Sequence, residues 1–153
     1  MSDVQVGQPA PDFTLRDENG QSVHLADLRG QTVVLMFYPL DFSPVCTGEM
    51  CEIRDRFPDI EGTGARLYGI SRDSVYTHKA FKEKEGLKQS LLSDMTGVAA
   101  REYGAWNEQA GIASRLTVVV DKDGKIAFTD RSPANPTPRD QQKLVDALKQ
   151  LAA

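Results

Sequence analysis

The two cysteines of the chain, Cys46 and Cys51, are the residues whose type and spacing carry the most chemistry. Cys46 follows an apolar segment and a turn, and the Ser43-Pro44 pair before it has the form of a helix cap followed by proline at the first helical position. We therefore expect Cys46 in the first turn of a helix, where peptide N–H groups lack intrahelical partners and the helix dipole favours an anion. Both effects stabilise a thiolate, which is the nucleophilic form of cysteine.

A thiolate nucleophile also needs hydrogen-bond donors that absorb the charge developing on its substrate. Ser43 lies one turn before the sulfur and can place a hydroxyl there, while Pro39 and Pro44 would stiffen the turn and shield the thiolate from water. Two of these residues also have a purely structural interpretation. Ser43 could only cap the helix, and Cys51, which lies off the apolar face of that helix, could be a half-exposed and idle thiol.

The segments on either side of Cys46 predict a β-α-β unit that would hold it in place. Residues 32–37 form a continuous β-branched and aromatic run, which is typical of a buried central strand, and residues 66–71 form a second strand. The helix that begins at Ser43 would connect them, so we expect the two strands to be parallel and the crossover to be right-handed.

Shorter patterns predict the other elements of the chain. Asn-Gly and Asp-Gly turns each indicate a hairpin, and apolar periodicity with glycine or proline punctuation indicates further helices. The last helix is expected to follow a cap at Thr137-Pro138 and to bury Leu144, Val145, Leu148 and Leu151. The remaining predictions are hairpins of 13–15 with 22–24 and of 116–120 with 126–128, helices over 74–85 and 96–103, and a strand at 91–92. Together they predict one three-layer α/β domain over residues 1–153, with a mixed central sheet.

Length and composition exclude several classes of function. A chain of 153 residues fits one domain with a hydrophobic core. Its longest apolar run, residues 33–38, is too short to span a bilayer, and no leader pattern is present, so we expect a cytoplasmic protein. A net charge of −4 gives no electrostatic reason to bind nucleic acid. His24 and His78 do not combine with the cysteines in a zinc-ligand spacing, so no metal site is expected.

The motif around Cys46 resembles that of a known family. Pro39, Ser43 and Cys46 match P-x-x-x-[TS]-x-x-C, the active-site motif of the peroxiredoxins. Residues 6–15, VGQPAPDFTL, resemble the opening strand of that family, and residues 113–126, ASRLTVVVDKDGKI, resemble its later active-site segment. The resemblance covers the whole chain. It implies a thioredoxin-like α/β fold with a central mixed sheet, helices on both faces and an N-terminal β-hairpin.

The resemblance also implies a reaction. Cys46 would attack the terminal oxygen of hydrogen peroxide, an alkyl hydroperoxide or peroxynitrite and would become a sulfenic acid. Ser43 and Arg115 would stabilise the charge that develops as the O–O bond breaks, and Glu49 would orient Arg115. Haem, flavin and metal ions have no part in this chemistry, so no cofactor is expected.

Two kinds of partner follow from the same resemblance. One is a reductant of the thioredoxin type or of the glutaredoxin or mycoredoxin type. The other is a second copy of the chain, because members of this family pack the loops around their active sites against each other. We expect a homodimer held by exposed aromatic residues such as Phe42 and Trp106.

Cys51 leaves the recycling step open. The pieces LLSD, YGAWNEQAGIASR and VVVD resemble the alkyl hydroperoxide reductase E subgroup, whose best-known members are described as having a single catalytic cysteine. A cysteine five residues after the nucleophile instead resembles the resolving position of the PrxQ, or bacterioferritin comigratory protein, subgroup. The resemblance therefore allows a disulfide between Cys46 and Cys51, or a one-cysteine cycle in which an external thiol attacks directly.

Two other functions remain as alternatives from the residues alone. A thioredoxin-type disulfide oxidoreductase would share the β-α-β start, but that chemistry normally uses Cys-x-x-Cys in the first helical turn, which this chain lacks. A non-catalytic redox sensor would be oxidised only in stoichiometric amounts, whereas an enzyme would turn over with a thiol reductant.

Overall fold

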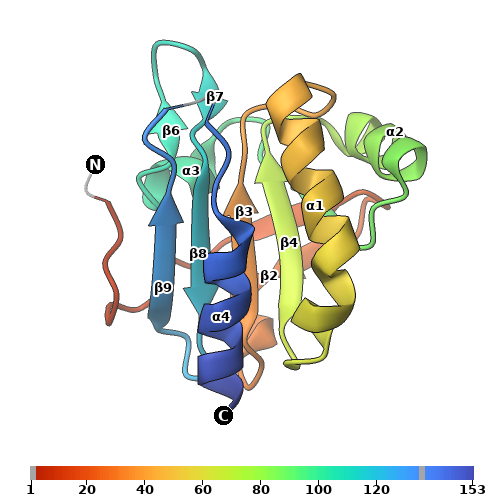
Figure 1. Cartoon of the computed structure of the whole chain (residues 1–153). Coiled ribbons are helices and arrows are strands. Elements are labelled where there is room, and N and C mark those ends of the chain that lie inside the picture. Colours follow the sequence, from red (N-terminus) through yellow and green to blue (C-terminus); the bar gives the residue numbers. More distant parts are fainter. Residues whose placement is uncertain (1–2, 135–136) are drawn as a thin grey trace.

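One seven-stranded mixed sheet runs through the centre of the molecule (Figure 1). The structure is a computed structural model that describes residues 3–134 and 137–153. The strands of the sheet are β1 (Thr14–Asp17), β2 (Ser22–His24), β3 (Val33–Phe37), β4 (Arg66–Ser71), β5 (Ser90–Ser93), β8 (Leu116–Val120) and β9 (Ile126–Arg131). Their order is β2-β1-β5-β4-β3-β8-β9, with β3, β4 and β5 parallel to one another and the other neighbours antiparallel. A small second sheet pairs β6 (Trp106–Asn107) with β7 (Ile112–Ala113).

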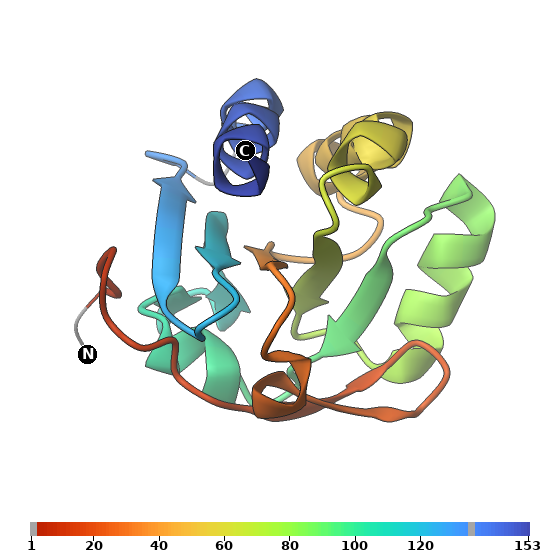
Figure 2. The same ribbon diagram turned by 90° about the horizontal axis from the view of Figure 1, so that it is seen from below.

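Helices cover both faces of the large sheet (Figure 2). On one face lie α1 (Pro44–Glu61) and α4 (Gln141–Ala152), and on the other lie α3 (Val98–Glu102) and the 3-10 helix Leu25–Leu28. The fourth helix, α2 (Val75–Glu85), packs beside β5 and contributes Phe81 to the core beneath α1. The predicted α/β class, with a mixed sheet between helices and an N-terminal hairpin, is confirmed.

The composition of the central strand β3 explains why helices must cover both faces of the sheet. All five residues of its Val-Val-Leu-Met-Phe sequence are buried, and successive side chains point to opposite faces. Val34 and Met36 join the core under α1 and α4, while Leu35 and Phe37 join the core on the other face. Because β3 ends directly before the turn that leads into α1, this strand fixes where Cys46 lies.

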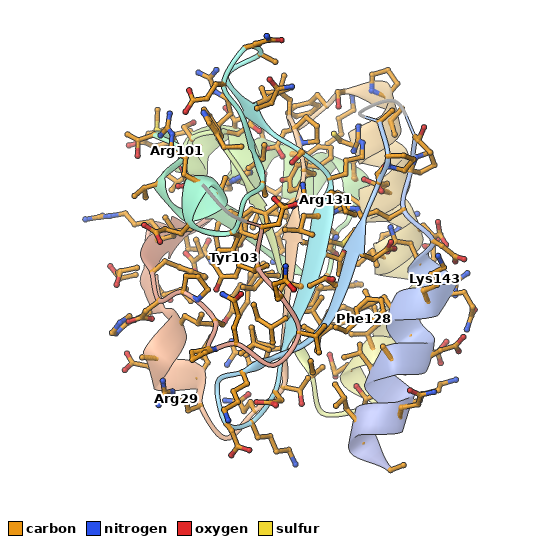
Figure 3. The ribbon with its side chains drawn as sticks, turned by 90° about the vertical axis from the view of Figure 1, so that its left-hand side faces the viewer. Arg29, Arg101, Tyr103, Phe128, Arg131 and Lys143 are labelled. Atoms are coloured by element: carbon orange, nitrogen blue, oxygen red, sulfur yellow. The ribbon has the colours of Figure 1, made fainter. Side chains whose placement is uncertain are left out.

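The face opposite α1 is packed around Tyr103, which Figure 3 shows among the side chains between α3 and the sheet. Its ring lies 5.3 Å from the ring of Phe37 and 6.4 Å from that of Phe13, measured between centroids. Its hydroxyl donates to the Pro11 carbonyl oxygen at 2.6 Å. Burial raises the pKa of Tyr103 far above its ordinary value, so the phenol stays neutral and ties the N-terminal segment to this core.

Most predicted elements are present, and the 3-10 helix Leu25–Leu28 is an addition that was not predicted. The helix predicted over 96–103 is shorter, and the paired two-residue strands β6 and β7 were not predicted. The last helix does not begin at Thr137-Pro138, since Asp140 is the cap and its carboxylate accepts from Gln142 N at 3.0 Å. Leu151 was predicted to be buried and is exposed, because it lies in the last turn of α4, close to the chain end.

Within the described residues, each helix falls short of the length or the apolar character needed to cross a membrane.

Candidate active site

Cys46 is buried in the first turn of α1, as the sequence predicts, and its side chain has no exposed surface. Ser43 is the N-cap residue, Pro44 is the first helical residue, and the Ser43 carbonyl oxygen accepts from Thr47 N at 2.8 Å. The Ser43 hydroxyl does not cap the helix: it donates to the Leu40 carbonyl oxygen at 3.0 Å. The structural interpretation of Ser43 as a side-chain cap is therefore wrong, and its hydroxyl instead closes the turn before α1.

Arg115 joins Cys46 to Glu49. Its Nη1 lies 3.1 Å from Cys46 Sγ and 2.7 Å from Glu49 Oε1, and both Arg115 and Glu49 are almost completely buried. Arg115 directly precedes β8, and β8 is the neighbour of β3, so the sheet brings the guanidinium to the beginning of α1. A buried guanidinium beside a sulfur can donate to the negative charge that develops on a substrate. The sequence-predicted residues Cys46, Arg115 and Glu49 thus form one contact network.

A second arginine, Arg139, completes this network, and sequence reasoning missed it. Its main-chain N and its Nε donate to Glu49 Oε2 at 2.7 and 3.0 Å, and its Nη2 donates to Glu49 Oε1 at 2.9 Å. Its Nη1 donates to the Phe37 carbonyl oxygen at 2.6 Å, at the end of β3. Arg139 lies in the loop before α4, where its neighbours in the sequence look like a helix start. A fully buried carboxylate such as Glu49 needs more than one donor, and this need would have pointed to a second basic partner. The burial of Glu49, however, is known only from the structure.

The two arginines determine the charge of Glu49. Burial alone would raise the pKa of this carboxyl, but the hydrogen bonds and charge of Arg139, together with the charge of Arg115, hold the pKa below its ordinary value. Glu49 is therefore a carboxylate that holds both guanidinium groups. Through Arg115 it fixes a donor against the sulfur of Cys46.

Hydrogen bonds among buried side chains hold the turn between β3 and α1 in place. The Tyr38 hydroxyl donates to Asp41 Oδ1 at 2.5 Å, and His78 Nδ1 lies 2.6 Å from Asp41 Oδ2. His78 Nε2 lies 2.9 Å from the Leu92 carbonyl oxygen, so both ring nitrogens of this buried imidazole face an acceptor. Burial and the nearby Asp41 raise the pKa of Tyr38 well above its ordinary value, which keeps this phenol a donor.

The side chain of His78 has no exposed area, while that of His24 is half-exposed. The imidazole of His78 ties α2 to the turn between β3 and α1. Asp41, Asp73 and His78 form a cluster of groups that could hold a metal ion, since their candidate ligand atoms all lie within 4.8 Å of one another. These atoms are already engaged in hydrogen bonds: Asp73 Oδ2 accepts from Ser71 Oγ at 2.5 Å and from Asp41 N at 2.9 Å. The cluster is a hydrogen-bonded support for the turn.

Phe42 gives the turn an unusual backbone. It has a φ of +68°, and it is the one non-glycine residue with positive φ among residues 3–134 and 137–153. Its ring lies 5.0 Å from the buried ring of Phe81, and the Lys84 ammonium lies 5.9 Å above it. Phe42 is nevertheless 46% exposed, as expected for a residue that could contact another subunit. Pro39, at the start of the same turn, is buried.

Trp106 does not have the predicted exposure. It is half-buried against the core, the Arg101 guanidinium carbon lies 4.8 Å from its ring centroid, and a Cβ added to Gly97 would lie 2.8 Å from its ring. The indole therefore packs largely against its own chain, and the prediction that Trp106 is exposed is wrong.

Cys51 and Cys46 are both free thiols on α1. Cys51 is half-buried, and its Sγ donates to Glu85 Oε1 at 3.5 Å, on the last residue of α2. The site thus consists of a buried cysteine at a helix start with a guanidinium against its sulfur, and a second thiol one and a half turns further along.

The chain is similar to known proteins of one family in sequence and in fold. The sequence model of the AhpC/TSA family matches residues 6–129. The chain belongs to the AhpC/TSA family, the peroxiredoxins. It is 42% identical over 153 residues to alkyl hydroperoxide reductase E of Mycobacterium tuberculosis, across 98% of this chain and 99% of that relative. It is 38% identical over 134 residues to the chloroplastic peroxiredoxin Q of Oryza sativa subsp. japonica, across 87% of this chain and 62% of that relative.

Solved peroxiredoxin structures have the same fold. The crystal structure of peroxidoxin BcpB from Mycobacterium tuberculosis matches 97% of this chain and 98% of its own, with a TM-score of 0.87 and 30% identity. That of Enterococcus faecalis AhpC matches 95% and 90%, with a TM-score of 0.88 and 28% identity. These similarities confirm the predicted peroxiredoxin type of the α/β fold.

Proposed function

We propose that this peroxiredoxin is a thiol-dependent peroxidase that reduces hydroperoxides with Cys46. Membership of the family supports the activity. The single observation that carries the assignment of residues is the 3.1 Å contact between Arg115 Nη1 and Cys46 Sγ at the beginning of α1. Hydrogen peroxide, alkyl hydroperoxides and peroxynitrite are the proposed substrates.

The proposed reaction begins with attack of the Cys46 thiolate on the terminal peroxide oxygen. The S–O bond forms as the O–O bond breaks, and Cys46 becomes a sulfenic acid. The leaving oxygen of hydrogen peroxide or an alkyl hydroperoxide takes a proton to become water or an alcohol, whereas peroxynitrite releases nitrite. Arg115 and the free N–H groups of the first helical turn would stabilise the charge on the oxygens. Ser43 could assist only by giving up its bond to Leu40, because a hydroxyl has one proton to donate. Pro39 would shape the turn, and Glu49 would hold Arg115 in place.

The proposed second step converts the sulfenic acid to a disulfide through Cys51. Cys51 attacks the sulfenic sulfur of Cys46, the S–O bond breaks, and the hydroxyl leaves as water, which gives a Cys46–Cys51 disulfide. A reductant of the thioredoxin type, or of the glutaredoxin or mycoredoxin type, then reduces this disulfide. The alternative is a one-cysteine cycle, in which an external thiol attacks the sulfenic acid and Cys51 stays idle.

We also propose a setting for the enzyme. A cycle that consumes thiol reductants belongs in a reducing compartment, and the cytoplasm is the proposed location. The proposed assembly is a homodimer in which the exposed ring of Phe42 contacts the second copy. No cofactor enters any step of the reaction.

Replacement of the nucleophile tests the proposed function. Cys46→Ser should abolish peroxide consumption while leaving the circular dichroism spectrum and melting temperature close to those of the parent, because an alcohol is a far weaker nucleophile than a thiolate. Cys51→Ser is the matched control, since it replaces a thiol on the same helix but should still be oxidised once by peroxide. Catalytic turnover in Cys46→Ser would overturn the assignment.

A further inference from the structure

An intact α1 keeps Cys51 away from Cys46. Both residues lie within the continuous helix Pro44–Glu61. Five helical positions correspond to about 7.5 Å along the axis and roughly 140° around it. A disulfide requires Cα atoms within about 7 Å and converging side chains, so the bond can form only after part of α1 unwinds. What holds Cys51 in the folded helix therefore bears on the rate of the second step.

Cys51 is docked on the C-terminal end of α2. Its Sγ donates to Glu85 Oε1 at 3.5 Å, and Arg54, three residues later on the same side of α1, donates from Nη1 to the Glu85 carbonyl oxygen at 2.5 Å. Gln89, the residue before β5, donates from Nε2 to the Met50 carbonyl oxygen at 3.3 Å. Glu85 therefore receives one bond from the thiol and one from the guanidinium, and Gln89 holds the adjacent turn of α1.

The groups around Cys51 favour its protonated form. Burial raises the pKa of the Cys51 thiol, and the hydrogen bond to Glu85 raises it further. The charge of Arg54 opposes this shift, while the charges of Glu85 and Asp55 add to it, and the net effect is a raised pKa. These are the charged groups that face the thiol, Arg54 and Asp55 from α1 and Glu85 from α2.

We propose that Glu85 is a positioning residue that restrains Cys51. It keeps the thiol protonated and docked on α2, and so slows formation of the Cys46–Cys51 disulfide until α1 opens and the contact is lost. The inference rests on the proposed two-cysteine function. When the contact breaks, the Cys51 proton goes to solvent, the thiolate forms the S–S bond, and the hydroxyl of the sulfenic acid leaves with a proton as water.

The restraint determines how long the sulfenic acid on Cys46 persists. A second peroxide molecule can oxidise that sulfenic acid to a sulfinic acid before Cys51 arrives. A slower disulfide step therefore makes the enzyme easier to inactivate at high peroxide, and removal of the Glu85 carboxylate should make it more resistant.

Alkylation of Cys51 tests the restraint directly. In the Cys46→Ser variant Cys51 is the only thiol, and its rate of reaction with iodoacetamide as a function of pH reports its thiolate fraction. Glu85→Gln keeps an acceptor oxygen but removes the charge, so the profile should move to lower pH, with a rate at pH 7 about threefold higher or more. Glu83→Gln, an exposed carboxylate on the same helix, is the matched control. A Glu85→Gln profile that superimposes on this control would overturn the proposal.

Single-turnover kinetics test the consequence in the protein that has both cysteines. After one equivalent of hydrogen peroxide, loss of two hydrogens in the quenched mass spectrum measures the disulfide, which should form faster in Glu85→Gln and Glu85→Ala than in Glu83→Gln. Equal rates in all variants would overturn the restraint while leaving the two-cysteine cycle intact. A persistent gain of one oxygen in the parent would instead overturn the two-cysteine cycle and the proposed effect on its rate. In that case the alkylation profiles still decide whether Glu85 controls the thiol.

Discussion

At the scale of single residues, the site places one guanidinium against a sulfur that has no contact with solvent. Arg115 Nη1 bonds both Cys46 and Glu49, so a single donor group connects the proposed nucleophile to the carboxylate that holds this guanidinium in place. Such a donor is most useful when the substrate is charged in the transition state and water is absent, since both conditions strengthen the interaction.

Arg115→Met should therefore slow oxidation of Cys46 strongly. Loss of one donor aimed at a developing oxyanion typically costs on the order of 100-fold or more in rate. The second-order rate constant can be followed by stopped-flow fluorescence of Trp106, the single tryptophan of the chain. Arg29→Met, at an exposed arginine on the other side of the sheet, serves as the control. An unchanged rate constant in Arg115→Met would remove Arg115 from the mechanism.

Glu49 predicts a pH dependence of stability. Its pKa is below the ordinary value of 4.5 in the folded protein, so its contribution is complete above that pH and is lost as the pH falls through the lowered value. Glu49→Gln should flatten this acid limb in urea unfolding. The same substitution should cost about 3–5 kcal/mol at pH 7, because two buried guanidinium groups lose their counter-charge. Glu52→Gln, at a half-buried glutamate paired with Arg56 on the same helix, should cost under about 1 kcal/mol.

The sequence predicts those site residues whose role depends on close neighbours. Ser43, Pro44 and Cys46 lie within four positions, and their cap-and-helix pattern determines where the sulfur lies. Glu49 and Arg115 required the family motif, since nothing local distinguishes them from solvated side chains. Neither the local pattern nor the family motif identifies Arg139, because its bond to Glu49 joins residues 90 positions apart and follows from how the loop before α4 packs.

At the scale of elements, α2 contacts the region of the candidate site near both of its ends. Near its beginning His78 bonds Asp41 in the turn before α1, and at its end Glu85 bonds Cys51 within α1. The beginning of α2 is itself fixed by Ser74, whose hydroxyl accepts from Thr77 N at 3.2 Å. Motion of α2 would therefore reach both the turn and the second cysteine.

The hydrogen bonds of His78 are expected to contribute strongly to the free energy of unfolding. His78→Leu leaves the Asp41 carboxylate and the Leu92 carbonyl oxygen without their buried partner, so we expect a loss of about 3 kcal/mol or more in the free energy of unfolding. The control is His24→Leu, whose half-exposed ring bonds Asp12 and whose loss should cost under about 1 kcal/mol. Equal unfolding midpoints in urea for the two variants would contradict this reading of the buried network.

Elements with long or strongly patterned segments were predictable, and short ones were not. β3 and β4 follow from continuous apolar runs, and both hairpins follow from Asn-Gly and Asp-Gly turns. β6 and β7 have two residues each, too few to show a period of two, and they exist because the loop folds over the core at Trp106. The start of α4 was misplaced because two cap signatures lie three residues apart, and the carboxylate of Asp140 is the one that bonds the helix.

At the scale of the whole molecule, the exposed ring of Phe42 offers a test of the proposed homodimer. Phe42→Asp should shift sedimentation equilibrium at micromolar concentration from dimer to monomer, because a charge would be buried without a partner in the interface. Leu151→Asp, at an exposed residue on α4 near the C-terminus and at the opposite end of the molecule, should remain dimeric (Figure 1). A parent protein that sediments only as a monomer would contradict the proposal.

Glu49 bonds two arginines that lie far from it in the sequence, and this has a consequence for synthesis of the chain. Its bonds to Arg115 and Arg139 span 66 and 90 residues, and the bond from Arg139 to Phe37 spans 102. Contacts of such long range form late in folding, and a growing chain cannot make them before residue 139 has left the ribosome. A nascent or prematurely terminated chain therefore carries both cysteines without the guanidinium framework around Cys46. The guanidinium framework around Cys46 is therefore completed only after the segment that contains Arg139 has been synthesised.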